Sequence, residues 1–230
     1  MEDELLIVEE LMLLLLADDG SAIAGSKVLH CVLPGAVLAE LALTGRLEVH
    51  SHRRVGGTLI HAKRTTPDPQ IDPILAEALR AMGTREHSAY GLISGLELDV
   101  RQPVLDRLAA KGIILRETKK VLGVLPTTRW PTLDVRAEAD LRDRVTAVLD
   151  DGRLPDARTA AIIALISAAQ VYVQLQPRMP WNAEVATRLK EIERGQVSAA
   201  DAAPESQEII EEIARAVLAM TSSASSAPIL

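Results

Sequence analysis

The chain has 230 residues, a formal net charge of −7 and an isoelectric point near 5.3. This acidic balance excludes adsorption of the whole surface onto DNA or an anionic bilayer, so any anionic partner must bind a local basic patch. Hydrophobic residues make up 48% of the chain, which is enough for a sizeable core. Phe is absent, and only two Trp and two Tyr are present. We therefore expect Leu, Ile, Val and Ala packed between helices, and no base-stacking surface for single-stranded nucleic acid.

The sequence predicts a cytoplasmic protein. The first residues are acidic where a secretory signal would be basic. The most apolar run covers residues 11–17, which is much shorter than the roughly 20 residues of a membrane span. Cys31 is the one cysteine, so no internal disulfide is expected, and its apolar helix predicts an inert core thiol. Arg outnumbers Lys by 19 to 6, which favours a bacterial origin.

Hydrophobic spacing predicts two apolar helices at the start of the chain, over residues 3–17 and 27–43, with Pro34 inside the second helix. The turn Asp18-Asp19-Gly20 ends the first of them. An alternating strand over residues 46–50 and a glycine-containing strand over 55–60 predict a β-hairpin. Two further helices are expected near residues 72–82 and 84–94.

A helix over residues 96–111 and a second hairpin are predicted next. The hairpin has strands at 113–115 and 121–125 around a charged turn. The remainder predicts helices at 133–149, 157–172, 181–194 and 204–220. No break in composition divides the chain. We therefore expect a mainly α fold, a single compact helical domain over residues 1–220 with two β-hairpins, and a disordered tail over 221–230.

Catalytic motifs are missing from the sequence. We see neither a phosphate-binding glycine loop nor a dinucleotide-binding glycine pattern, and expect a protein that is not an enzyme. A catalytic site assembled from scattered residues remains an alternative. The hairpin could bring His50, His52 and His61 together, but ordinary surface histidines are the better interpretation, so we expect no metal and no cofactor. We interpret the paired carboxylates at 9–10 and 18–19 as solvated helix faces and ends.

Basic residues gather at both hairpins and on the helix before the second one. Two interpretations are open: ordinary turn and surface charge, or basic loops that contact an anionic headgroup or a nucleic-acid backbone. The predicted tip residues are Arg53 and Arg54 in the first hairpin and Arg116, Lys119 and Lys120 in the second, with Arg101, Arg107 and Lys111 on the helix.

A helix followed by a hairpin, over residues 104–125, is also the outline of a winged helix. A nucleic-acid-binding protein is therefore the alternative function. The acidic total charge opposes this function, and so do Glu97 and Asp99 at the start of the helix that would be the recognition helix.

Several blocks resemble the Golgi phosphoprotein 3 family. They are LLIVEELMLL at 5–14 followed by Asp18-Asp19-Gly20, LPGAVLAELALTGRL at 33–47, VLDRLAAKGI at 104–113, and the terminal helix at 209–220. The blocks occur in order along nearly the whole chain, and their small residues resemble the bacterial branch. The resemblance implies a helical domain with one protruding hairpin. It also implies a peripheral membrane protein that binds phosphatidylinositol 4-phosphate and acts as an adaptor for membrane-protein tails.

The resemblance places the headgroup site, a Trp and three basic residues, at Gly25, Pro34, Leu98 and Arg101, of which Arg101 alone is kept. Lys27 is close enough to Gly25 to replace part of the lost charge. One arginine holds a multiply charged headgroup weakly. We therefore expect binding to anionic lipid, with phosphoinositide specificity in doubt.

The apolar residues Leu122, Val124 and Leu125 have three possible roles. They could insert into lipid, pack against another copy of the chain to form a homo-oligomer, or cover the protein's own core. The last is slightly favoured.

Overall fold

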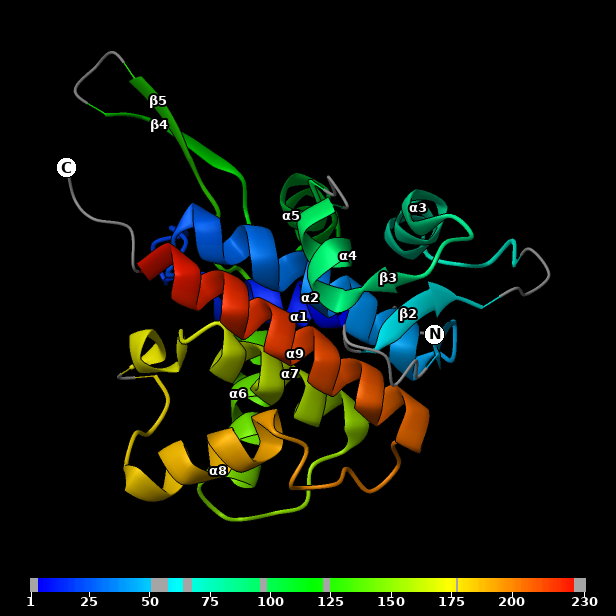
Figure 1. Ribbon diagram of the computed structural model, residues 1–230. Helices are drawn as coiled ribbons and strands as arrows, with labels where there is room; N and C mark the ends of the chain where they lie inside the picture. Colours follow the sequence, from blue (N-terminus) through cyan, green and yellow to red (C-terminus); the bar gives the residue numbers. More distant parts are fainter. Residues whose placement is uncertain are drawn as a thin grey trace.

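The computed structural model describes residues 4–50, 58–63, 68–95, 99–121, 125–176 and 178–225. At the centre of the molecule, α2 (Ser26–Leu43) packs most extensively against three other helices, as Figure 1 shows. These are α1 (Ile7–Leu14), α7 (Ala157–Ala168) and α9 (Pro204–Ser225). All four bury Leu, Ile, Val or Ala side chains, so the aliphatic helical core that the composition predicted is confirmed.

The apolar character of α2 follows from this central position. It is the one helix among the described residues with the length and hydropathy of a membrane span, and 72% of it is buried inside the protein. Gly35 allows the neighbouring helices to come close, because a Cβ at this position would lie 3.2 to 3.3 Å from side-chain atoms of Leu165, Ile213 and Val217. The LPGAV block is therefore a helix-packing motif.

The remaining elements lie around these four helices (Figure 1). An antiparallel sheet of three strands has the order β1-β2-β3, with Glu48 opposite His61 in the first pair. Its strands are β1 (Leu47–His50), β2 (Leu59–Ala62) and β3 (His87–Ser88). The other helices are α3 (Pro73–Met82), α4 (Ala89–Gly95), α5 (Arg101–Ala110), α6 (Val135–Leu149), the 3-10 helix η1 (Tyr172–Leu175) and α8 (Ala183–Glu193).

The second hairpin lies further along the chain than predicted. Its strands are β4 (Glu117–Val121) and β5 (Leu125–Arg129), and it projects from the body of the protein in Figure 1. The charged stretch that was predicted as a turn is mostly strand, because the antiparallel ladder with β5 overrides the weak β-propensity of its residues. The mainly α fold with β-hairpins is thus confirmed, and the register of this hairpin is corrected.

Two helix boundaries also differ from the prediction. The helix expected over 96–111 begins at Arg101 as α5. The last helix continues to Ser225, so residues 221–225 of the expected disordered tail are helical. Thr221 anchors this extension, because its buried hydroxyl donates to the backbone oxygen of Ala168, 3.0 Å away. The sequence interpretation missed a contact that only the packed fold provides.

The carboxylates of α1 are buried, so the prediction that they lie on a solvated face is wrong. The exposed fraction of Glu9 is 0% and that of Glu10 is 6%. Glu9 accepts a hydrogen bond from the backbone nitrogen of Leu6 at 2.8 Å, and its carboxylate oxygens lie 3.2 Å from Lys111 Nζ and 3.4 Å from Arg107 Nη2. The partners come from α5, far away in sequence, so the local pattern could not predict them.

A half-buried arginine connects three helices of the core. Arg158 Nε of α7 donates to Glu10 Oε2 at 2.6 Å, and its Nη1 lies 3.1 Å from Glu40 Oε1 of α2. The other Glu40 oxygen accepts from the backbone nitrogen of Ile7 at 2.6 Å, where α1 begins. Removal of Arg158 would leave the buried Glu40 carboxylate without this cation, whereas Glu10 would keep its ion pair with Arg144 of α6.

The turn Asp18-Asp19-Gly20 fastens the projecting hairpin to the core. The backbone oxygen of Gly20 accepts from Trp130 N at 2.9 Å, and Asp19 pairs with Arg129 at the end of β5. Gly20 has a φ of +75°, and a Cβ there would lie 2.3 Å from backbone atoms of Trp130. Glycine is therefore required at this close approach of two chain segments.

Candidate anion-binding site

A hollow of about 100 Å³ lies where the N-terminal half of α2 meets the start of α5. Its apolar walls are buried, whereas its polar and charged side chains are exposed. The buried members are Leu29, Leu33, Pro34 and Val100; the exposed members are Ser26, His30, Asp99 and Arg101. The hollow thus has the form of a small ligand site, with an apolar base and a polar rim.

Two helices begin at this hollow, and neither has a side-chain cap. The N-cap residues are Gly25 for α2 and Val100 for α5, and the first turns of both helices lack acidic residues. By contrast, Asp72, Asp134 and Asp156 cap α3, α6 and α7. Backbone N–H groups and the positive end of the helix dipole favour an anion at such a terminus.

The charged side chains add a modest positive field. Arg101 is the first residue of α5, and Lys27 follows Ser26 in the exposed first turn of α2. Within the described part of the chain, no ion pair engages either cation. Asp99 on the rim opposes them, which leaves a small local excess of positive charge on a protein with a net charge of −7. Such a site suits one phosphate group better than an extended polyanion.

The positions that the family resemblance assigned to the headgroup converge here. Pro34 and Arg101 both line the hollow, and Gly25 directly precedes the lining residue Ser26. Leu98 lies outside the described residues. Two regions that are distant in sequence are therefore brought together, as the resemblance implied.

Among the predicted tip cations of the two hairpins, Arg116 is the one whose side chain the structure describes. Arg116 precedes β4 at the foot of the hairpin, where its guanidinium lies 5.5 Å from the ring centroid of Trp130 and 4.0 Å from Asp106. Its predicted place at the tip is wrong, because the strands begin later. Lys119 and Lys120 are in β4, with side chains outside the described set, and Arg53 and Arg54 are outside the described residues altogether.

Two cations of the helix before the hairpin are also engaged elsewhere. Arg107 pairs with Asp72 at 2.5 Å and with buried Glu9, and Lys111 pairs with the same glutamate. They stabilise the contact between α5 and α1, and so contribute little to a docking surface. Of the predicted apolar hairpin residues, Leu125 begins β5, with a side chain outside the described set, and Leu122 and Val124 lie outside the described residues.

Sequence reasoning did not identify Ser26 and His30 as site residues. Both lie on one face of α2 together with three other lining residues. Counted from Ser26, the spacings are three, four, seven and eight residues, for Leu29, His30, Leu33 and Pro34. This helical periodicity was available in the sequence. What the sequence did not provide was the partner surface at the start of α5.

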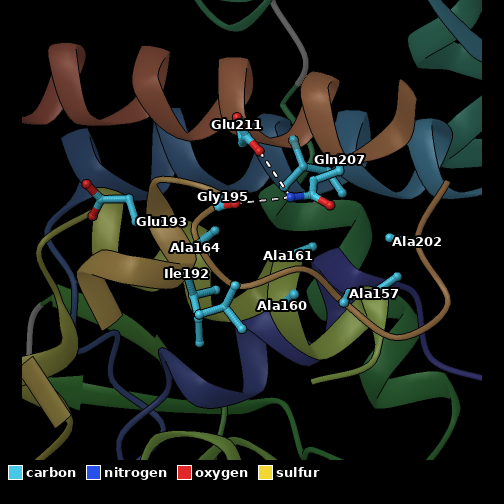
Figure 2. A pocket seen from close by; sticks show the side chains of 13 residues that line it. Ala157, Ala160, Ala161, Ala164, Ile192, Glu193, Gly195, Ala202, Gln207 and Glu211 are labelled. Carbon is cyan, nitrogen blue, oxygen red and sulfur yellow. Dashed lines mark hydrogen bonds between the residues drawn. The ribbon is translucent and has the colours of Figure 1, made fainter. Parts of the chain in front are cut away.

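A second hollow lies between α7, α8 and α9, and Figure 2 shows it from close by. It is lined mainly by small side chains, including Ala157, Ala161 and Ala164, and its volume of about 30 Å³ suits little more than one water molecule. The Gln207 amide donates to the Gly195 backbone oxygen and to Glu211, each at 3.3 Å. The charged lining residues are acidic, so this hollow does not suit an anion.

The fold and the hollow define a helical domain with a projecting hairpin and a candidate site for a small anion at two helix N-termini. The model of the Golgi phosphoprotein 3 (GPP34) family matches residues 7–213 of this chain. The chain therefore belongs to the Golgi phosphoprotein 3 family. No curated protein matches the sequence at a significant level.

Proposed function

We propose that this protein is a peripheral membrane protein that docks on anionic lipid through the hollow between α2 and α5. The observation that carries the proposal is the meeting of two uncapped helix N-termini at one exposed hollow, with Arg101 on its rim and Lys27 next to the lining residue Ser26. A lipid phosphate would accept hydrogen bonds from backbone N–H groups and one guanidinium. No disulfide, metal or cofactor is needed for this role.

The charge of the protein sets the expected strength of binding. At a net charge of −7 the chain is repelled from an anionic bilayer at long range, so attraction must come from the local site. Each basic residue near the surface contributes about 1 kcal/mol, and this contribution falls with rising salt. Pro34 stands where the resemblance implies a cation, so we infer binding to anionic lipid in general rather than to one phosphoinositide.

The adaptor part of the proposal depends on family membership alone. A membrane-protein tail would be the client, and a cytoplasmic location at the membrane surface would follow. The nucleic-acid alternative is less favoured, because Arg107 and Lys111 of α5 are paired with buried Glu9. A mobility shift with random DNA at low salt would revive that alternative.

Co-sedimentation with vesicles tests the lipid proposal. Neutral, generic anionic and phosphoinositide vesicles are compared at low and high salt, with Arg101→Ala beside the parent chain. We expect both anionic vesicles to bind the parent, salt to weaken binding, and Arg101→Ala to weaken it about fivefold. Arg153→Ala is the matched control, since this exposed arginine lies in the connection between α6 and α7 and does not line the hollow.

Equal binding to neutral and anionic vesicles would contradict the proposal. So would an equal loss of affinity in the Arg101 and Arg153 variants, because this would show a charge effect spread over the whole surface.

A further inference from the structure

Three side chains of metal-ligand type gather on the outer face of the β1–β2 pair. Glu48 lies directly opposite His61 in the strand register, and His50 is two residues further along the same face of β1. One potential ligand atom from each of the three lies within 4.8 Å of the other two. The opposite face of the pair carries buried Leu47 and Ile60, which pack on the core and so fix the orientation of the strands.

The His61 imidazole is only partly satisfied by the protein. Its Nε2 lies 3.2 Å from Glu48 Oε2, its side chain is 16% exposed, and its Nδ1 is buried with no hydrogen-bond partner among the described residues. A buried polar atom without a partner costs free energy and calls for an explanation. The His50 ring lies close, with its centroid 4.3 Å from that of His61. Two imidazoles and one carboxylate thus face one small volume.

Glu86 provides the outer hydrogen bond that metal-binding histidines usually have. Its Oε1 lies 2.7 Å from His50 Nδ1, on the segment just before β3. A carboxylate that accepts from Nδ1–H fixes the tautomer in which Nε2 carries the ligating lone pair, and it orients the ring. This arrangement distinguishes the cluster from histidines scattered on a surface.

The donor set selects the class of ion. Two imidazole nitrogens and one carboxylate suit Zn²⁺ and other late first-row divalent ions, whereas Ca²⁺ and Mg²⁺ prefer oxygen ligands throughout. Lys63 moderates the affinity, because its Nζ lies 3.2 Å from Glu48 Oε1 and competes for that carboxylate.

We propose that Glu48, His50 and His61 bind one Zn²⁺ or similar divalent transition-metal ion, with Glu86 as a positioning residue. Three protein ligands leave a coordination position open for water or a fourth ligand. The ion joins β1 to β2, next to the segment that connects them. This proposal is independent of the lipid site, which lies on α2 and α5.

Titration of the full chain with metal tests the proposal. The protein is purified without a polyhistidine tag, stripped with a chelator and titrated with Zn²⁺ in a calorimeter, and with Co²⁺, whose visible spectrum reports nitrogen ligands. We expect one ion per chain and no binding of Mg²⁺. His61→Gln and His50→Gln should each weaken binding more than tenfold, and Glu86→Gln about tenfold. Lys63→Met should bind the ion more tightly than the parent.

His30→Gln is the control, because this exposed histidine lies on α2, away from the sheet. Circular dichroism confirms that each variant is folded, and Zn²⁺ should raise the thermal midpoint of the parent and of His30→Gln but not of His61→Gln. Failure of the parent to bind Zn²⁺ would overturn the proposal. Equal losses in His30→Gln and His61→Gln would also overturn it, since this would indicate binding to histidines in general.

Discussion

Pro34 in the middle of α2 and Arg101 at the start of α5 line the same hollow, although the two residues are far apart in the sequence. The family resemblance implies a cation at both positions, and this chain keeps only the arginine. The proposed headgroup site therefore has a reduced charge. Such a site favours weak binding of anionic lipid, and this binding should weaken further as the salt concentration rises.

A Trp introduced at Gly25 should strengthen membrane binding. Gly25 has a φ of −63°, and nothing lies within 4 Å of a Cβ built there, so the larger side chain meets open space. An indole beside the hollow can sit at the bilayer interface. We expect Gly25→Trp to sediment with anionic vesicles severalfold better than the parent, with a free energy of unfolding changed by less than about 1 kcal/mol.

Ala200→Trp is the control for this gain. Ala200 is exposed in the connection between α8 and α9 and does not line the hollow. An equal gain in both Trp variants would indicate that an exposed Trp increases vesicle binding regardless of its position. This would count against the hollow as the docking face.

Loss of Arg158 should destabilise the protein strongly. This guanidinium pairs with Glu10 and Glu40, whose side chains are 8% and 9% exposed. Ala would remove the cation beside Glu40, while Glu10 would keep Arg144. Breaking a buried ion pair on one side costs about 3–5 kcal/mol. We expect Arg158→Ala to lose this much in urea unfolding, whereas exposed Arg153→Ala changes stability by less than about 0.5 kcal/mol. A loss below 1 kcal/mol would show that the network is dispensable.

Substitution of Gly20 should reveal how closely the turn approaches the hairpin. Ala at a φ of +75° costs about 1 kcal/mol in backbone strain, and its Cβ would also overlap backbone atoms of Trp130 and Pro131. Gly112→Ala is the matched control, with a φ of +72° and nothing within 4 Å. We expect thermal denaturation to show at least twice the loss for Gly20→Ala. Equal losses would mean that backbone strain alone explains the glycine.

Tyr172 should make the stability fall at alkaline pH. Burial, and then the nearby Asp150 carboxylate, raise the pKa of Tyr172 to about 12, from an ordinary value near 10. The folded state therefore holds a proton that the unfolded state releases, so the stabilisation is complete below about pH 10 and is lost as pH rises towards 12. Ultraviolet titration of the Tyr90→Phe variant, in which Tyr172 is the remaining tyrosine, should show ionisation near the raised value. Ionisation near pH 10 in the folded protein would contradict the burial of this hydroxyl.

The helical core could be predicted from local patterns, because apolar spacing in α2, α7 and α9 is a property of each segment alone. The buried ion pairs of Glu9 and Glu10 could not be predicted in this way, since their cationic partners come from α6, α7 and the end of α5. The place of the β4–β5 hairpin was missed for a related reason: pairing between strands, rather than the composition of either strand, fixed its register.

The candidate site shows the same division. Arg101 could be found from the family resemblance, and Lys27 from its closeness to Gly25. Ser26, His30 and Asp99 required the packing of α2 against the start of α5. For the histidines, the sequence placed His50 and His61 across one hairpin. The hydrogen bond between His50 and the Glu86 carboxylate, however, depends on the approach of β3.

The most direct test of the account compares two charge changes at the hollow, on either side of Val100. Asp99→Asn removes the one negative charge among the lining residues, and Arg101→Ala removes the positive one. If the hollow binds a lipid phosphate, the affinity for anionic vesicles at low salt should rise severalfold in the first variant and fall about fivefold in the second. Changes of the same sign, or no change in either variant, would contradict the account.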